Sequence, residues 1–90
     1  MLKRRMMQVE VIVGKFYRHF LGKYYRVLFI ASDSTTPMGE PLKEIVVYEE
    51  LEGKHRIWTR PIELFCEKVD KDLYPTETQE YRFKLIEDYD

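Results

Sequence analysis

The stretch that decides the fold is Gly14-Lys15-Phe16-Tyr17-Arg18-His19-Phe20-Leu21-Gly22-Lys23-Tyr24-Tyr25-Arg26-Val27. Two alternating runs flank Leu21-Gly22, a short loop with glycine second, and this pattern predicts a β-hairpin. A two-residue turn there pairs Phe20 with Lys23, His19 with Tyr24, Arg18 with Tyr25 and Tyr17 with Arg26. One face then carries Phe16, Arg18, Phe20, Tyr25, Val27 and Phe29, and the other carries Tyr17, His19, Tyr24, Arg26, Leu28 and Ile30.

The rest of the chain repeats this pattern of short strands between turns. Strands are predicted over 8–13, 15–20, 23–31, 44–51, 56–60, 65–69 and 80–86, with a helical turn over 61–65 and loops over 32–42 and 70–79. The run 27–31 is apolar throughout, which predicts burial of both its faces. These elements indicate an all-β domain, a small and strongly bent antiparallel barrel with one helical turn.

Length and composition place the chain among small folded domains. Its 90 residues make a single domain over 1–90, with a loose basic lead-in expected over 1–7 and an acidic tail over 87–90. One cysteine excludes an internal disulfide and fits a reducing compartment. The only apolar run near the N-terminus is interrupted by Glu10 and is too short for a membrane span. We therefore expect a cytoplasmic protein without a membrane association.

The charges are divided unevenly along the chain. Residues 1–26 carry seven bases and one acid, whereas residues 27–90 carry eight bases and fifteen acids. Such a split is compatible with a basic nucleic-acid patch, but in a folded barrel the two halves interleave and opposite charges meet. The formal net charge of −1 lacks the basic excess of nucleic-acid binders, so we do not expect such a partner. Edge strands 8–13 and 80–86 are expected to pair within one chain or between two copies in a homodimer.

A set of short motifs resembles a known family. Tyr-Arg-His-Phe-x-Gly at 17–22 is followed by Tyr-Tyr, Val-Leu, Val-Val-Tyr at 46–48, Leu-x-Gly at 51–53, Trp-x-Arg-Pro at 58–61 and Phe-x-Glu-x-Val at 65–69. This order, over about residues 14–70, resembles the bacterial and phage family called domain of unknown function 1653. The resemblance implies an SH3-like β-barrel and implies no activity.

The chain departs from that family pattern at three places. A His-Ser-Glu-Thr run is replaced here by Ser32-Asp33-Ser34-Thr35-Thr36, so a site built on that loop histidine would be lost. Glu52 stands where an aromatic residue is common, and Tyr81-Arg82-Phe83 replaces a closing Pro-Arg-Phe. The strand over 8–13 looks like an addition to the family domain.

Aromatic and arginine side chains are the candidate binding groups. Trp58 and Arg60 share a strand face and could hold a planar anionic ligand, with Tyr48 on the facing strand. The competing interpretation, which we favour slightly, makes Trp58 a core anchor and pairs Arg60 with Glu63 or Glu67. The candidate ligand-binding residues are Tyr17, Arg18, His19, Tyr25, Tyr48, Trp58 and Arg60.

Catalytic and metal chemistry has weaker support. His19 could act as a general base, but a structural histidine bonded to a carbonyl or to Tyr24 is the simpler interpretation. Cys66 fits a small core residue better than a nucleophile, and His55 fits an exposed turn. The spacing of histidines and cysteine predicts no metal site, and no motif predicts a cofactor.

Three functions follow in order of preference. The first is a non-enzymatic binding module, with an aromatic and arginine pocket that sequesters a small planar or anionic, nucleotide-like ligand. The second is a protein–protein interaction module that uses exposed tyrosines and the loop over 32–42. The third is a small hydrolase in which His19 works with Asp33 or Glu63.

Overall fold

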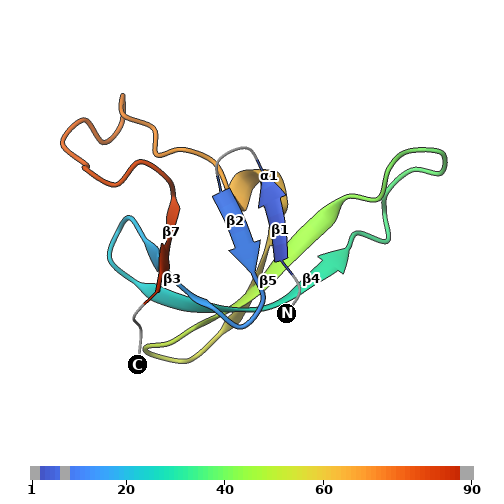
Figure 1. Ribbon diagram of the computed structural model, residues 1–90, viewed down its shortest axis with the longest axis horizontal. Helices are drawn as coiled ribbons and strands as arrows, with labels where there is room; N and C mark the ends of the chain where they lie inside the picture. The colour runs from blue at the N-terminus through green and yellow to red at the C-terminus, as the bar shows by residue number, and fades with distance from the viewer. Residues whose placement is uncertain (1–2, 7–8, 88–90) are drawn as a thin grey trace.

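The computed structural model describes residues 3–6 and 9–87. Their elements are β1 (Lys3–Met6), β2 (Val9–Ile12), β3 (Phe16–His19), β4 (Tyr24–Ser32), β5 (Glu44–Glu50), β6 (Ile57–Pro61), α1 (Ile62–Phe65) and β7 (Phe83–Ile86). β1 and β2 form a two-stranded sheet, and the other strands form a five-stranded antiparallel sheet in the order β6-β5-β4-β3-β7 (Figure 1). The domain is all-β, as predicted, and in the described residues the larger sheet stays open between β6 and β7.

Several strand predictions need correction. Lys3–Met6 pairs with β2 as a strand, where a loose lead-in was expected. The predicted strand over 65–69 is reduced to one bridge between Lys68 and Tyr81. β2 pairs with β1 and β7 pairs with β3, so the expected pairing of β2 with β7 does not occur between the described residues of the chain. The predicted tail lies mostly outside the described residues, since only Glu87 is included.

The central hairpin has a different register from the one predicted. Phe16 lies opposite Arg26, Tyr17 opposite Tyr25 and Arg18 opposite Tyr24. The reason is the loop, which has three residues instead of two and is closed by the Gly22 N–H to the His19 carbonyl at 2.8 Å. A two-residue type I′ turn would require a positive φ at Leu21, whereas here Gly22 takes it, at +108°. The one-residue slip puts Tyr17 and Tyr25 on the same face.

A bulge in β4 decides which apolar residues of that strand are buried. The pairing with β5 shifts between Val27, opposite Tyr48, and Phe29, opposite Val47. Because the bulge adds one residue, inward positions pass from Val27 to Ile30 and Phe29 turns outward, where it is 64% exposed. The prediction that both faces of 27–31 are buried is therefore wrong.

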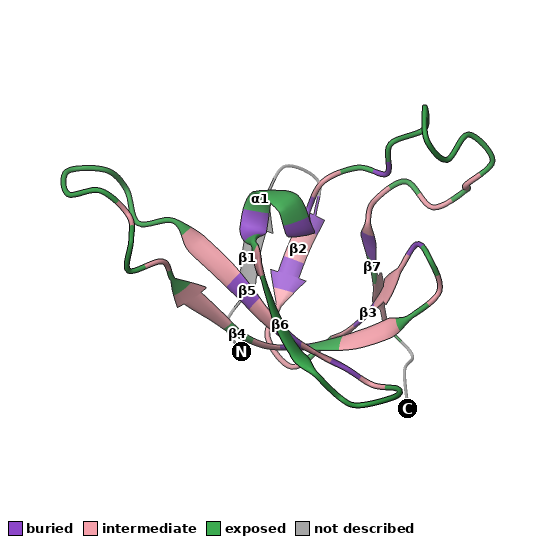
Figure 2. Ribbon diagram, turned by 180° about the vertical axis from the view of Figure 1, so that it is seen from behind, coloured by how far each residue is buried: buried purple, intermediate pink, exposed green. Residues whose placement is uncertain are grey.

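The core fills the concave side of the five-stranded sheet, beneath β2 and α1 (Figure 2). Phe65 and Phe83 stack with ring centroids 4.1 Å apart, and Tyr48 meets both rings edge-on. The buried residues that form this core are Val9, Val11, Tyr17, Val27, Val46, Tyr48, Ile62, Phe65, Cys66 and Phe83. Val9 and Val11 are the residues that β2 contributes to this core.

Tyr17 joins the two sheets. Its ring is fully buried against Phe65, and its hydroxyl accepts the Ile12 N–H and donates to the Glu10 carbonyl, each at 2.9 Å. Burial raises the pKa of this hydroxyl to about 12. The Tyr17 hydroxyl therefore supplies the hydrogen bonds that a neighbouring strand would otherwise give to this edge of β2.

Removal of this hydroxyl should loosen the attachment of β2. We expect Tyr17→Phe to lower the free energy of unfolding by about 2 kcal/mol, because the Ile12 N–H and the Glu10 carbonyl lose their partner. Urea denaturation followed by circular dichroism measures the loss. Tyr74→Phe, at a half-exposed ring in the loop before β7, is the matched control and should change stability by less than about 0.5 kcal/mol. Equal stability of the Tyr17→Phe variant and the wild type would contradict this role.

Candidate functional site

Four of the seven candidate residues gather around the ring of Phe83. The ring centroids of His19, Tyr25 and Tyr48 lie 5.0, 5.7 and 5.5 Å from that of Phe83. The Arg60 guanidinium carbon lies 6.0 Å from the same ring centre. These side chains come from β3, β4, β5 and β6, which the curved sheet brings together on its concave side.

A second set of contacts ties Trp58 to this group. Trp58 lies opposite Tyr48 in the β5–β6 pairing, and its indole N–H donates to Glu50 Oε2 at 3.3 Å. Two residues along the same face of β6, Arg60 Nε donates to the Tyr48 hydroxyl at 3.2 Å. We refer to His19, Tyr25, Tyr48, Glu50, Trp58, Arg60 and Phe83 as the aromatic–arginine cluster.

Part of the cluster is open to solvent. Trp58 is 43% exposed, so the expectation that it anchors the core is wrong. The physical reason is its strand, because β6 is an edge of the sheet and is exposed along most of its length (Figure 2). Arg60 and Tyr25 are half-buried, whereas Tyr48 lies in the core. The cluster therefore offers an accessible indole and a guanidinium above a buried aromatic base.

Arg60 does not form the predicted ion pairs. Glu67 instead binds Arg82, with Arg82 Nε 2.9 Å from Glu67 Oε1, and Glu63 lies exposed on α1. Within the described residues, no carboxylate forms an ion pair with the Arg60 guanidinium. Its positive charge is thus shared only with neutral groups, the Tyr48 hydroxyl and the Phe83 ring.

Glu50 is a buried carboxylate that stays charged. Its Oε1 accepts the Arg56 N–H at 3.0 Å, and its Oε2 accepts the Trp58 indole N–H. The Arg56 hydrogen bond is the main cause that lowers the pKa of Glu50, and the Trp58 indole and the charges of Lys23 and Arg56 add to it. In contrast, burial raises the pKa of Tyr25. The cluster therefore carries one cation and one anion at neutral pH.

His19 is neutral and structural in its immediate contacts. Its Nδ1 accepts the Leu21 N–H at 3.1 Å inside the hairpin loop, and its ring stacks on Phe20 at 4.7 Å. Burial lowers the pKa of His19 to about 4, and the positive charges of Arg82, Arg60 and Arg18 lower it further. The partner found for Nδ1 is a backbone N–H, where a carbonyl or Tyr24 was predicted.

The geometry gives little support to the hydrolase. A histidine whose pKa is about 4 is a weak general base near neutral pH. Asp33 follows the nine residues of β4, so it lies roughly 30 Å along the strand from the hairpin loop that holds His19. The Asp33 carboxylate accepts the Thr35 N–H and hydroxyl in its own loop.

Tyr17 and Arg18 lie outside the cluster. Tyr17 belongs to the core, as described above, and Arg18 points to the opposite face of β3, where it donates to Gln79 Oε1 at 2.8 Å. The expected pair of Arg18 and Tyr25 fails because of the register slip, which places Arg18 opposite Tyr24. Gln79 returns a hydrogen bond from Nε2 to the Arg18 carbonyl at 3.0 Å.

Cys66 and His55 lie where the simpler predictions put them, in the core and in an exposed turn. Cys66 is buried in the core, and burial raises the pKa of its thiol to about 11, so it is a poor nucleophile. His55 is exposed in the β5–β6 turn. Among the residues described, no three His, Cys, Asp or Glu side chains are grouped to hold a metal ion. No helix in the described part of the chain has the length and apolar character to cross a membrane.

Two cluster residues were missed at the sequence level. Phe83 alternates with Tyr81 and Leu85 in the last strand, and this period marks it as inward-facing, but nothing local indicates that other rings converge on it. Glu50 stands on the same face of β5 as Tyr48 and Val46, where a charged residue at an inward position is an unusual signal.

Comparison with known proteins finds one family. The family profile described as Protein of unknown function (DUF1653) matches residues 15–85. The match extends through β7, beyond the 14–70 range of the expected resemblance, and leaves β1 and β2 outside. No curated protein and no solved structure matched the chain.

The pKa of His19 gives a testable pH dependence. Below its ordinary pKa of 6.5, the unfolded chain takes up a proton that folded His19 refuses until about pH 4, so stability falls as pH falls through this window. Asn at position 19 can still accept the Leu21 N–H but does not titrate. We expect the Tm of the wild type to fall about 4 °C more than that of His19→Asn between pH 7 and 4.5. Parallel curves in thermal denaturation would show that His19 is not held neutral.

Proposed function

Since the chain belongs to the family described as Protein of unknown function (DUF1653), we propose a function from its own side chains: it is a non-enzymatic binding module. The observation that carries the proposal is the aromatic–arginine cluster, in which Trp58 and Arg60 remain accessible above a packed base of rings. A merely structural cluster would be expected to bury its only tryptophan.

The proposed ligand is small, planar and anionic, in the manner of a nucleotide. A planar ring would stack on the exposed Trp58 indole, an interaction worth about 1–3 kcal/mol for a nucleobase. The remaining N–H groups of Arg60 would bind the anionic part, since a guanidinium matches carboxylate and phosphate geometry. Glu50 supplies acceptor oxygens for an amino group on the ring. One site therefore offers a distinct partner for each part of a nucleotide.

Arg60 is the cation of the cluster and the group that would bind an anion. Three arginines, Arg82, Arg60 and Arg18, act together on His19. Arg82 is paired with Glu67 and Arg18 lies on the opposite face of β3, which leaves Arg60 as the cation nearest the exposed indole. We further propose that the protein sequesters its ligand, because binding without catalysis has that direct consequence.

The finer architecture is also a proposal. We propose an SH3-like barrel because β3, β4, β5 and β6 follow one another as a meander, α1 makes one turn, and β7 returns beside β3. This order is that of SH3-like barrels. The cytoplasm is the compartment proposed, since the one cysteine is buried and unpaired.

A protein-interaction module stays the second candidate, because a groove runs beside β7. A homodimer through the N- and C-terminal edge strands, β2 and β7, also stays a proposal, since β7 is an edge of the larger sheet. A nucleic-acid partner is not proposed, on the charge balance of −1. The hydrolase remains the last candidate.

Ligand binding can be tested by thermal shift. A nucleotide panel, supplied at about 100 times the dissociation constant of a true ligand, should raise the Tm by about 10 °C or more for that ligand. Arg60→Gln should abolish the shift, because the guanidinium is lost while a hydrogen-bond donor to Tyr48 is kept.

The control for this experiment is Arg26→Gln. Arg26 is also an arginine above an aromatic ring, 5.8 Å from the centre of Phe16, but it is exposed on the opposite face of the sheet. It should retain the full thermal shift. The proposal would be abandoned if no nucleotide stabilised the wild type, or if Arg26→Gln and Arg60→Gln lost the shift equally.

A further inference from the structure

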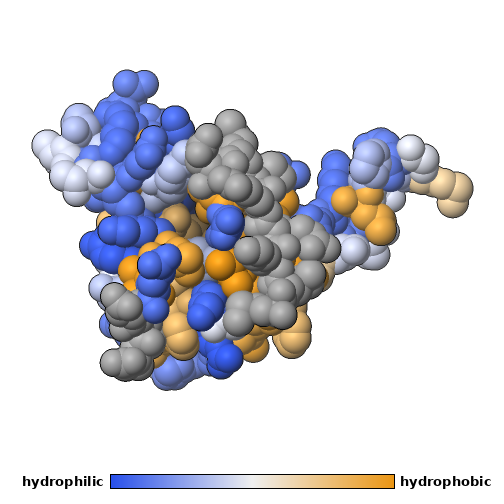
Figure 3. Space-filling model, in the orientation of Figure 1, coloured by the Kyte–Doolittle hydropathy of each residue, from blue (hydrophilic) through white to orange (hydrophobic). Residues whose placement is uncertain are grey.

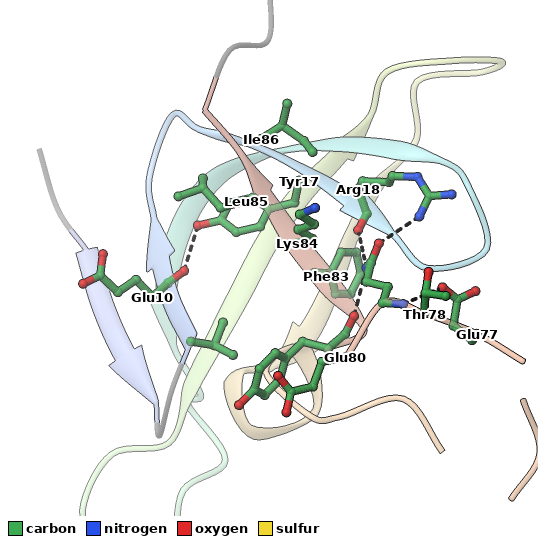
Figure 4. Close-up of a pocket in the computed structure, with 13 residues that line it drawn as sticks. Glu10, Tyr17, Arg18, Glu77, Thr78, Glu80, Phe83, Lys84, Leu85 and Ile86 are labelled. Atoms are coloured by element: carbon green, nitrogen blue, oxygen red, sulfur yellow. Dashed lines mark hydrogen bonds between the residues drawn. The ribbon is translucent and has the colours of Figure 1, made fainter. Parts of the chain in front are cut away.

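A groove of about 750 Å³ separates β2 from β7 and shares only Phe83 with the aromatic–arginine cluster (Figure 4). Its volume lies within the usual range of ligand sites. Val9 and Glu10 form one side, Tyr17 reaches across beneath it, and residues 77–81 close one end. Figure 3 shows apolar surface among polar side chains in this region.

The groove runs along the edge of β7 and not over one of its faces. Phe83 and Leu85 share the core-facing side of β7 with Tyr17, whereas Lys84 and Ile86 point the other way, and all four line the groove. A cavity that touches both faces of one strand lies beside its edge. The other edge of β7 is paired with β3.

The pairing pattern shows which main-chain groups of β7 face the groove. His19 donates its N–H to Lys23 across the β3–β4 hairpin, and Tyr17, two residues earlier, has the same orientation. These residues therefore turn their main-chain groups toward β4, so their β7 partners, Phe83 and Leu85, receive no hydrogen bonds from them. The main-chain N–H and C=O groups of Phe83 and Leu85 consequently point into the groove.

The opposite wall cannot satisfy these groups. The edge of β2 that faces away from β1 is occupied by the Tyr17 hydroxyl, which binds the Ile12 N–H and the Glu10 carbonyl. β2 and β7 are not paired in the described residues. β7 is therefore an edge strand whose main-chain groups at Phe83 and Leu85 face the groove. The Tyr17 hydroxyl occupies the edge of β2 and prevents β2 from pairing with β7.

We propose that this groove binds an extended peptide segment of a partner protein, which adds to β7 as a strand. The peptide exchanges hydrogen bonds with Phe83 and Leu85, as in other cases of strand addition. Its side chains on one face contact Leu85 and Tyr81, the partly buried apolar residues that line the groove beside the core. This site is independent of the proposed ligand site.

The charges of the lining favour a basic peptide. The carboxylates of the lining are Glu10, Glu77 and Glu80, and its bases are Arg18 and Lys84. The three carboxylates exceed the two bases by one, and the Glu80 ion pair with Lys68 is a long one, 3.7 Å, between exposed side chains. Exposed pairs of this kind contribute little, so Glu80 is available to a lysine of the peptide. The favoured partner is an extended segment in which apolar and basic residues alternate.

The test uses the full 90-residue chain and a blocked (Val-Lys)₃ peptide, with amide exchange followed residue by residue in NMR spectra. In the free protein the Phe83 and Leu85 amides should exchange fast, and those of Lys84 and Ile86 slowly, because the latter bond to β3. Peptide at millimolar concentration should slow exchange at Phe83 and Leu85 at least tenfold and leave Lys84 and Ile86 unchanged. A (Val-Glu)₃ peptide should bind at least tenfold more weakly.

Two N-methylated isomers of the peptide provide the matched control. One carries methyl groups on the valine nitrogens and the other on the lysine nitrogens, so only one isomer keeps the N–H groups that face β7. One isomer should bind and the other should not, and Arg60→Gln should bind the peptide as well as the wild type.

Four results would overturn the proposal. They are slow exchange of Phe83 and Leu85 in the free protein, protection that rises with protein concentration and indicates a second copy, no binding of (Val-Lys)₃, and equal binding of the two methylated isomers.

Discussion

The rest of the structure depends on the hydroxyl of Tyr17. It holds β2 above the five-stranded sheet through one N–H and one carbonyl, and its ring fills the space below against Phe65. A buried hydroxyl requires partners, and the open edge of β2 provides both in one place. The same contact keeps β2 apart from β7, so the sheet gains a covered core without closing on itself. The core and the groove thus have one cause.

The aromatic–arginine cluster has a different origin, in the curvature of the sheet. The bulge in β4 turns Phe29 outward and Ile30 inward. The curved sheet brings side chains from β3, β4, β5 and β6 onto the ring of Phe83. Because β6 is an edge, its Trp58 and Arg60 meet this packed base from the solvent side. The packed rings around Phe83 hold the accessible side chains of Trp58 and Arg60 in place. This arrangement suits a small ligand, since the binding groups are ordered before the ligand binds.

Much of this fold could be predicted from the sequence, because alternation of apolar residues follows directly from strand geometry. The strands β2 to β6 were found in this way. The register of the hairpin could not be predicted in this way. A two-residue turn would strain Leu21, so the loop has three residues, and this shift of one residue changes which side chains of β3 and β4 share a face. Tyr17 was expected in a site and is found in the core, since both predicted faces of the hairpin carry aromatic residues and alternation alone does not say which face is inward.

The candidate site was predictable only in its residue types. Trp58, Arg60 and Tyr48 were correctly placed on facing strands, since register and period are local properties. Phe83 is remote in sequence from the residues that it gathers, and the exposure of Trp58 depends on β6 being an edge. Both features follow from the order of the strands in the sheet, which cannot be read from a local sequence pattern.

The most direct measurement of the central claim uses Trp58, the only tryptophan of the chain, as a reporter. If a nucleotide stacks on the exposed indole, titration with adenosine monophosphate or another member of a nucleotide panel should quench its emission in a saturable manner. The account predicts that the quenching and the thermal stabilisation share one dissociation constant. Stabilisation by a nucleotide with unchanged Trp58 emission would place the ligand elsewhere and contradict the account.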